Sequence, residues 1–391
     1  MPRLNPILDQ LAVYPQQELD RRKAAVIASG RPLYDFGVGD PIEPTPAFIR
    51  QALRDGVPEH CGYPGVAGTP GLRSSICGYL SRRFGIGLDP DRHVLPLSGA
   101  KEGVFHMPLL VIDPAAEDRL VVFPDPGYPA YARGALFAGG TPFPVLVEGD
   151  HFFRPWELSK DVLQRTRLLW LNTPHNPCGV VMPLEDLQRT ADICREHDIL
   201  CVSDESYADV YSGPPPNSIL ECGLENVLAI HSLSKRSGMT GYRSGFVAGD
   251  PAVIARLRSL RANPGLVPQS FVNAAAEAAW SEDAHVEQRR GLFLEKKRIF
   301  LSFFDELGWE VFGRDATLYL WLRTPGGRDA REWALELLSH GIVVSPGPMF
   351  STTGAGSGYV RLAMVPSQEV CRKAVALWRS IQEKEEGCGT A

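Results

Sequence analysis

A lysine and an arginine eight positions apart lie in a stretch of small and hydroxyl residues, "HSLSKRSGMTGYRSGF". An apolar run typical of a buried strand leads into it, so Lys235 comes just after the end of that strand. A lysine at that depth is desolvated, which lowers its pKa and frees its amine to act as a nucleophile. Arg243 can hold a phosphate. Taken alone, each side chain is more simply explained as the partner of a surface carboxylate.

Other polar and aromatic side chains follow neighbouring apolar runs. Asp204 ends the run "ILCVSD", at the carboxyl edge where open α/β sheets build their sites. Tyr207 follows three residues later, Asn176 lies in "LNTPHNPCG", and Tyr128 lies in "FPDPGYPAY". Each has a structural alternative: a helix cap or buried ion pair for Asp204, an Asx turn for Asn176, and core packing for Tyr128.

The segment "LSGAKEG" (97–103) joins a predicted strand to a predicted helix. Its small residues would let backbone N–H groups at the helix start face an anion. By itself it is better explained as a plain strand-to-helix turn.

The set as a whole matches the needs of pyridoxal 5'-phosphate. The aldehyde needs an amine, the pyridine nitrogen a carboxylate, the ring oxygen hydrogen-bond donors, and the phosphate an anion site. A metal site is the weakest alternative, because no second cluster of carboxylates or histidines accompanies Asp204.

Such a site needs many strand ends at one edge of a sheet. Short apolar runs alternate with helical stretches over 94–262, and seven of the runs read as strands, which predicts a largely parallel sheet covered on both faces. A helical pattern with one break covers 268–307, and a small α+β unit follows. We predict an N-terminal arm joined to the small domain (1–44), a large domain (45–282) and a small C-terminal domain (283–391).

Composition excludes several classes of function. The content of 44% hydrophobic and 22% charged residues is that of an ordinary globular protein. A net charge of -6 with scattered basic residues argues against a nucleic-acid partner. The eight cysteines form no CxxC pair and read as reduced thiols. No apolar run suits a signal peptide or a membrane helix, so we expect a cytoplasmic protein.

Across nearly all of its length the chain resembles the fold-type I, class I aminotransferases, which depend on pyridoxal 5'-phosphate. "SLSKRSGMTGYRSG" resembles the family motif in which the lysine carries the cofactor and the arginine binds its phosphate. The resemblance therefore implies these roles for Lys235 and Arg243. It implies phosphate contacts for Ser232 and Ser234.

Further motifs extend the resemblance around the cofactor ring. "SDESY" implies that Asp204 pairs with the pyridinium nitrogen and that Tyr207 donates to the ring oxygen. "NTPHNPCG" makes Asn176 a second donor to that oxygen, beside the substrate, and "PGYPAY" stacks Tyr128 on the ring. "SGAKEG" matches the phosphate loop, which is contacted through the backbone of its central residues, Ala100 and Lys101.

Three more motifs concern the substrate and a second subunit. "YVRLAM" implies that Arg361 clamps the substrate α-carboxylate, with Gly39 of "GVGDP" beside it. "YPGVAGTPGLR" implies that Tyr63 reaches the phosphate of the neighbouring subunit, and hence a homodimer. The chain departs from the family where Cys178 replaces a common threonine and Ala100 a frequent serine; the second change puts one phosphate hydroxyl in doubt.

The same motifs most resemble N-succinyldiaminopimelate aminotransferases and their LL-diaminopimelate relatives. That resemblance implies glutamate and 2-oxoglutarate as one substrate pair and a long dicarboxylic lysine precursor as the other. Aspartate, aromatic or secondary-metabolic amine substrates stay open, as does β-elimination on the same cofactor.

Two alternatives outside this chemistry are disfavoured. A ligand-sensing domain of a transcription regulator would need an N-terminal DNA-binding module, yet the site motifs begin by about residue 37. A nicotinamide reductase would need a GxGxxG motif after an early strand, which the sequence lacks.

Overall fold

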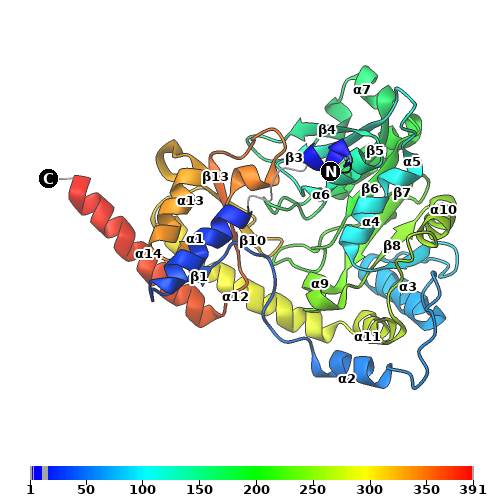
Figure 1. The fold of residues 1–391 in the computed structure, drawn as a ribbon, viewed down its shortest axis with the longest axis horizontal. Coiled ribbons are helices and arrows are strands. Elements are labelled where there is room, and N and C mark those ends of the chain that lie inside the picture. The colour runs from blue at the N-terminus through cyan, green and yellow to red at the C-terminus, as the bar shows by residue number, and fades with distance from the viewer. Residues whose placement is uncertain (1, 3, 11–15, 390–391) are drawn as a thin grey trace.

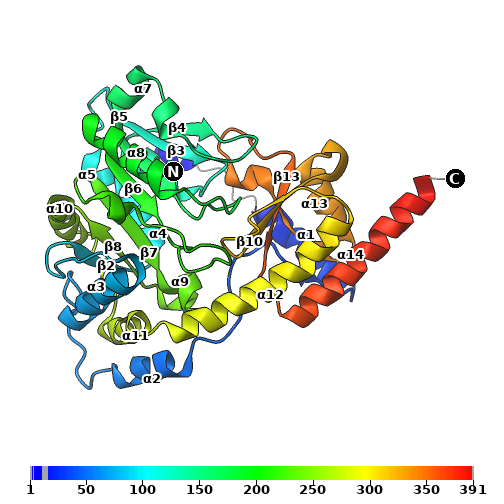
Figure 2. The same ribbon diagram turned by 180° about the vertical axis from the view of Figure 1, so that it is seen from behind.

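The fold has two units, each built around its own sheet. The computed structural model describes residues 2, 4–10 and 16–389. The long helix α12 (Ala284–Glu306) runs from the larger unit into the smaller one, as Figures 1 and 2 show.

The larger unit contains the predicted seven-stranded, mainly parallel sheet. Among its strands only β8 runs against the others, pairing antiparallel with both neighbours. In spatial order the strands are β2 (Val94–Leu97), β8 (Gly245–Gly249), β7 (Val227–Ser232), β6 (Leu200–Asp204), β5 (Thr166–Asn172), β3 (Leu120–Asp125) and β4 (Thr141–Leu146).

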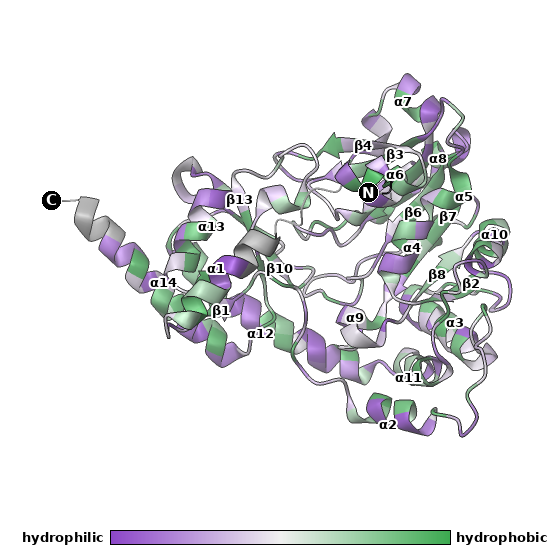
Figure 3. Cartoon of the chain, viewed as in Figure 1, coloured by the Kyte–Doolittle hydropathy of each residue, from purple (hydrophilic) through white to green (hydrophobic). Residues whose placement is uncertain are grey.

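Alternate residues of the central strands feed two separate cores, because successive side chains of a strand point to opposite faces. One core packs against α3 (Pro70–Phe84), α8 (Leu184–Glu196) and α11 (Ser270–Trp280). The other packs against α4 (Ala100–His106), α6 (Ala130–Phe137) and α10 (Pro251–Arg261). Figure 3 shows the apolar character of the strands between these layers. The unit also holds α2 (Ala47–Asp55), α5 (Pro108–Val111), α7 (Lys160–Arg165) and α9 (Leu233–Arg236).

The smaller unit is built on an antiparallel sheet. Its strand order is β12 (Ser345–Pro346), β13 (Tyr359–Ala363), β10 (Tyr319–Arg323) and β9 (Val311–Phe312). An aromatic core that includes Phe300, Trp333 and Trp378 packs this sheet against α12, α13 (Ala330–Ser339) and α14 (Gln368–Gly389).

The N-terminal segment joins this smaller unit. β1 (Tyr34–Asp35) pairs in parallel with β11 (Ile342–Val343), and α1 (Gln16–Ala28) contacts α13. These contacts support the predicted association of the N-terminal arm with the small domain, and the boundaries at 44 and 282 stay predictions. The 3-10 helices are η1 (Pro6–Gln10), η2 (Pro155–Glu157), η3 (Ile219–Cys222), η4 (Thr240–Tyr242), η5 (Pro325–Gly327) and η6 (Gly347–Phe350).

The helix predicted after "LSGAKEG" is divided into α4 and α5. Pro108 is the first residue of α5, where its missing N–H costs nothing. Within the described residues, no helix has both the length and the apolar character needed to cross a membrane.

Candidate active site

The carboxyl ends of the parallel strands face the smaller unit, and a cavity of about 1030 Å³ lies between the two. Twelve of the thirteen predicted site residues line it; Tyr63 is the exception. The twelve are Gly39, Ala100, Lys101, Tyr128, Asn176, Asp204, Tyr207, Ser232, Ser234, Lys235, Arg243 and Arg361.

Lys235 lies on α9, directly after the end of β7. Its Nζ donates a hydrogen bond to the carbonyl oxygen of Gly39. Burial lowers the pKa of Lys235 below its usual value, since the charged form loses hydration inside the cavity. An amine with a lowered pKa is a better nucleophile and a better proton acceptor at neutral pH.

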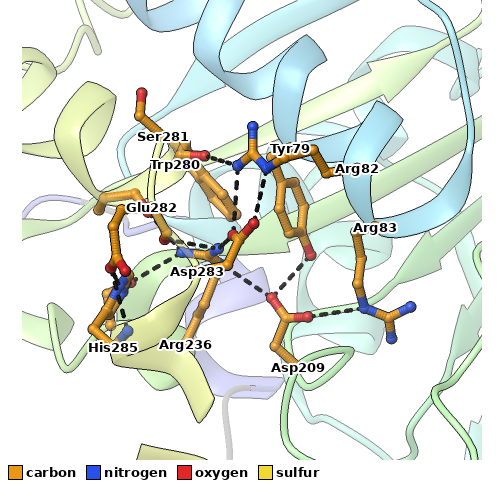
Figure 4. A network of polar contacts seen from close by, with 12 residues as sticks. Tyr79, Arg82, Arg83, Asp209, Arg236, Trp280, Ser281, Glu282, Asp283 and His285 are labelled. Carbon is orange, nitrogen blue, oxygen red and sulfur yellow. Dashed lines mark hydrogen bonds and ion pairs between the residues drawn. The ribbon is translucent and has the colours of Figure 1, made fainter. Parts of the chain in front are cut away.

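The residue after Lys235 anchors it to the rest of the unit. Arg236 is only 3% exposed, and its Nε donates to Asp209 Oδ2 at 2.9 Å. One terminal nitrogen donates to the carbonyl oxygen of Ala279 at 2.7 Å and the other to Asp283 Oδ1 at 2.5 Å. Figure 4 shows this network, which ties the Lys235 segment to the start of α12. No role was predicted for Arg236 from the sequence.

Asp209 is the centre of the same network. The Tyr79 hydroxyl donates to its Oδ2 at 3.0 Å, and Arg83 Nε donates to its Oδ1 at 3.1 Å (Figure 4). Burial alone would raise the pKa of Asp209, but the guanidinium groups of Arg236 and Arg83 bring it below the usual value. Because Asp209 lies two residues after Tyr207, the network anchors both Lys235 and the Tyr207 segment.

Asp204 ends β6 and is buried at the cavity wall. Its Oδ1 accepts from the backbone N–H and the hydroxyl of Ser206, at 3.2 and 2.6 Å, and its Oδ2 accepts from the Tyr131 hydroxyl at 3.1 Å. Burial raises the pKa of Asp204. In the described part of the chain no cationic side chain forms an ion pair with it. The site thus presents a buried carboxylate that a cationic ligand would stabilise.

Tyr319, which was not predicted as a site residue, lies on β10 and lines the cavity. Its hydroxyl lies 3.0 Å from that of Tyr207. Gly39 approaches it so closely that a Cβ there would lie 2.3 Å from the Tyr319 hydroxyl oxygen. Because strand residues alternate between faces, the run "YLWL" offered a faint signal, but it did not tell which face met the site.

Arg361 lies on β13 with its guanidinium between the rings of Tyr319 and Phe350, at 4.1 and 4.2 Å. Its terminal nitrogens donate to Asn176 Oδ1 at 2.9 Å and to the Gly37 carbonyl oxygen at 3.1 Å. Its Nε is buried and has no hydrogen-bond partner among the described residues. Because Arg361 lines the cavity, its guanidinium suits an anionic ligand such as a carboxylate.

A candidate anion site lies among other residues that line the cavity. The Ser232 Oγ accepts from the N–H of Ser234 at 3.2 Å, so its own hydroxyl proton stays available to a ligand. Arg243 lies against Gly99, where a Cβ would come within 2.4 Å of a guanidinium nitrogen. α4 starts directly after Gly99, and its first N–H groups have no acceptor within the helix.

Tyr63 lies outside the cavity. Its side chain is fully exposed, with a relative accessibility of 105%. The predicted contact of Tyr63 with a neighbouring subunit stays a prediction. Within the described residues, no group of three or more His, Cys, Asp or Glu side chains is placed to hold a metal ion.

The fold and the cavity define an α/β enzyme with a buried lysine, a buried carboxylate and an arginine clamp at the carboxyl edge of a parallel sheet. The chain belongs to the aminotransferase class I and II family, whose model matches residues 31–377. It is an aminotransferase, and membership implies pyridoxal 5'-phosphate as cofactor.

Individual proteins agree with this assignment. The chain is 34% identical over 379 residues to an LL-diaminopimelate aminotransferase of Aquifex aeolicus, covering 94% of this chain and 97% of the other. Substrate-bound BacF from Bacillus subtilis aligns with a TM-score of 0.90 at 25% identity, over 97% of this chain and 98% of the other. A probable N-succinyldiaminopimelate aminotransferase from Thermus thermophilus aligns with a TM-score of 0.87 at 27% identity, over 93% and 99%.

Proposed function

We propose that this aminotransferase moves an amino group between LL-diaminopimelate and 2-oxoglutarate, as a step of lysine biosynthesis. Similarity to LL-diaminopimelate aminotransferases over nearly the whole chain supports the substrate. The observation that carries the reaction is that Lys235, Asp204 and Arg361 line one cavity.

The donor set fits pyridoxal 5'-phosphate. Asp204 is a buried carboxylate without a described cation, as a protonated ring nitrogen requires. Gly99 leaves the space that Arg243 fills, and Ser232 keeps a hydroxyl proton for a phosphate oxygen. We propose that the cofactor is held by Ala100, Lys101, Tyr128, Asn176, Asp204, Tyr207, Ser232, Ser234, Lys235 and Arg243.

The bound cofactor would supply an electron sink for the carbon that loses its proton. Arg361 binds the substrate α-carboxylate and so fixes the direction of the Cα–H bond. Lys235 Nζ would accept the α-proton and deliver it to the far side of the substrate nitrogen, a role for which its lowered pKa suits it. Asp204 would keep the pyridine nitrogen protonated. The amide NH2 group of Asn176, whose Oδ1 accepts from Arg361, would donate to the ring oxygen.

The proposal is tested by incubating the purified enzyme with pyridoxal phosphate, LL-diaminopimelate and 2-oxoglutarate and measuring glutamate. We expect glutamate to form, and Lys235→Ala to lower kcat by about 10³-fold or more, because a positioned general base contributes on that order. Apo-protein melting temperature would serve as the folding control. If glutamate forms with N-succinyl-LL-diaminopimelate but not with LL-diaminopimelate, the succinylated compound replaces LL-diaminopimelate as the proposed substrate. Ammonia release without an oxo acid would favour the lyase.

We also propose a cytoplasmic homodimer. The seven cysteines from Cys61 to Cys371 are free thiols, which is typical of a reducing compartment. The full exposure of Tyr63 supports a role at a subunit interface.

A further inference from the structure

One buried carboxylate joins the two units beside the cavity. Asp125 ends β3 and is 1% exposed. Its Oδ2 accepts from three consecutive residues of the smaller unit: the hydroxyls of Ser351, Thr352 and Thr353 at 3.1, 3.3 and 2.8 Å, and the N–H groups of Thr352 and Thr353 at 3.3 and 3.2 Å. We call this contact the Asp125 clasp.

The clasp continues through the backbone toward the substrate clamp. The N–H of Gly127 donates to the carbonyl oxygen of Phe350 at 2.7 Å. The Phe350 ring in turn packs 4.2 Å from the guanidinium carbon of Arg361. Tyr128 and Phe350 both line the cavity, one from each unit. The clasp therefore connects two walls of the cavity at the place where Arg361 lies.

We propose that Asp125 is a positioning residue for substrate binding, an inference that rests on the proposed function. By holding residues 351–353, it keeps the Phe350 ring against Arg361, so that the guanidinium stays oriented toward the substrate α-carboxylate. Hydrogen bonds to an ionised carboxylate are stronger than those between neutral groups, and here several converge on one oxygen. In the described residues no cation pairs with Asp125, so these neutral donors alone compensate its charge.

The location of the clasp separates this role from general stability. Residues 351–358 form a loop between η6 and β13 that contains the positive-φ glycines Gly354 and Gly356. The loop contributes no residue to the main cores of either sheet. Loosening it should therefore affect the cavity wall more than the folding of the two units.

The test compares the holoenzymes of Asp125→Asn, Thr353→Val and Thr353→Ser with the wild type. Asp250→Asn is the matched control, because Asp250 also accepts backbone N–H groups, at the start of α10, but lies outside the cavity. For each variant, KM for both substrates, kcat, the visible absorption spectrum and hydrogen exchange at 347–358 are measured.

We expect Asp125→Asn to raise both KM values about tenfold, the loss of a charge-assisted contact, while kcat changes less than about threefold. Thr353→Val, which loses one donor, should raise KM less than Asp125→Asn does. Thr353→Ser keeps a hydroxyl and should have the KM of the wild type. The absorption spectrum should not change, and exchange at 347–358 should quicken only in the variants that lose the contact. Asp250→Asn should leave KM unchanged.

Two results would overturn the proposal: faster exchange at 347–358 with unchanged KM, or a parallel loss of kcat, absorbance and melting temperature. If the wild type did not use LL-diaminopimelate, only the proposed substrate would fail. The clasp would then be judged by the dissociation constant of 2-oxoglutarate, measured from the visible spectrum, with the same tenfold weakening expected in Asp125→Asn.

Discussion

At the scale of single residues, the ionisation of Asp204 depends on neighbours that the sequence motif does not contain. Tyr131 is fully buried, donates to Asp204 Oδ2, and stacks on Trp170 at 4.9 Å between ring centroids. It also meets the Tyr128 ring edge-on at 5.7 Å. One side chain thus supports both the carboxylate proposed for the ring nitrogen and the ring proposed to stack on the cofactor.

Tyr131→Phe should therefore shift the pH dependence of the enzyme. Burial raises the pKa of Asp204, and the hydrogen bonds from Ser206 and Tyr131 oppose that rise. Losing the Tyr131 hydroxyl should raise the pKa further, so activity should fall at a higher pH on the acid side. We expect the acid limb of kcat/KM to move up by about 0.5 to 1 pH unit. Ser206→Ala, which removes a donor to the other oxygen, should act in the same direction. An acid limb unchanged in both variants would contradict this account.

At the scale of elements, the sequence predicts well wherever a local pattern decides the structure. The seven strands of the large sheet and the break between α11 and α12 follow from apolar periodicity and its interruption. Motifs with fixed spacing, such as that of Lys235 and Arg243, identified most of the cavity. Tyr131, Tyr319 and the partners of Arg236 escaped because their roles depend on contacts between segments distant in sequence, such as Arg236 with Asp283. Apolar periodicity within one segment carries no information about contacts with a distant segment.

Lys297, on α12, should make the folding stability of the protein depend on pH. It lies buried on α12 and donates to the carbonyl oxygens of Gly313 and Ala316, at 2.5 and 2.7 Å, which fixes the loop before β10. Burial lowers the pKa of Lys297 from 10.5 to about 7. Between these values the unfolded chain binds more protons than the folded one, so this group's contribution to stability rises with pH.

The variant Lys297→Met should remove that dependence. The unfolding free energy of the wild type minus that of the variant should increase by about 1 kcal/mol per pH unit between roughly pH 7.5 and 9. Denaturant unfolding at several pH values measures it. Lys373→Met is the control, because Lys373 is exposed and pairs with Glu369 on α14. Parallel stability curves for wild type and Lys297→Met would show that Lys297 keeps an ordinary pKa in the folded protein.

At the scale of the whole molecule, the cavity needs both units and, on our proposal, a second chain. The larger unit supplies Lys235 and Asp204, and the sheet of the smaller unit supplies Arg361 and Tyr319. Tyr63 is an aromatic side chain that is fully exposed to solvent. An exposed aromatic ring is typical of an interaction site. A phosphate site completed by the Tyr63 of a partner chain would account for it, and would make the site incomplete in a monomer.

Subunit complementation tests this arrangement. Lys235→Ala alone should be inactive, and Tyr63→Phe alone should be impaired when pyridoxal phosphate is limiting. The two variants are then mixed so that dimers containing one chain of each form. If Tyr63 acts across the interface, such a mixed dimer has one complete site, with the intact Lys235 of one chain and the intact Tyr63 of the other. Random mixing makes half the dimers mixed, and each has one intact site, so activity should recover to about a quarter of the wild type. If Tyr63 acts within its own chain, the mixture cannot exceed the average of its parents, because every lysine-bearing chain then lacks its own tyrosine.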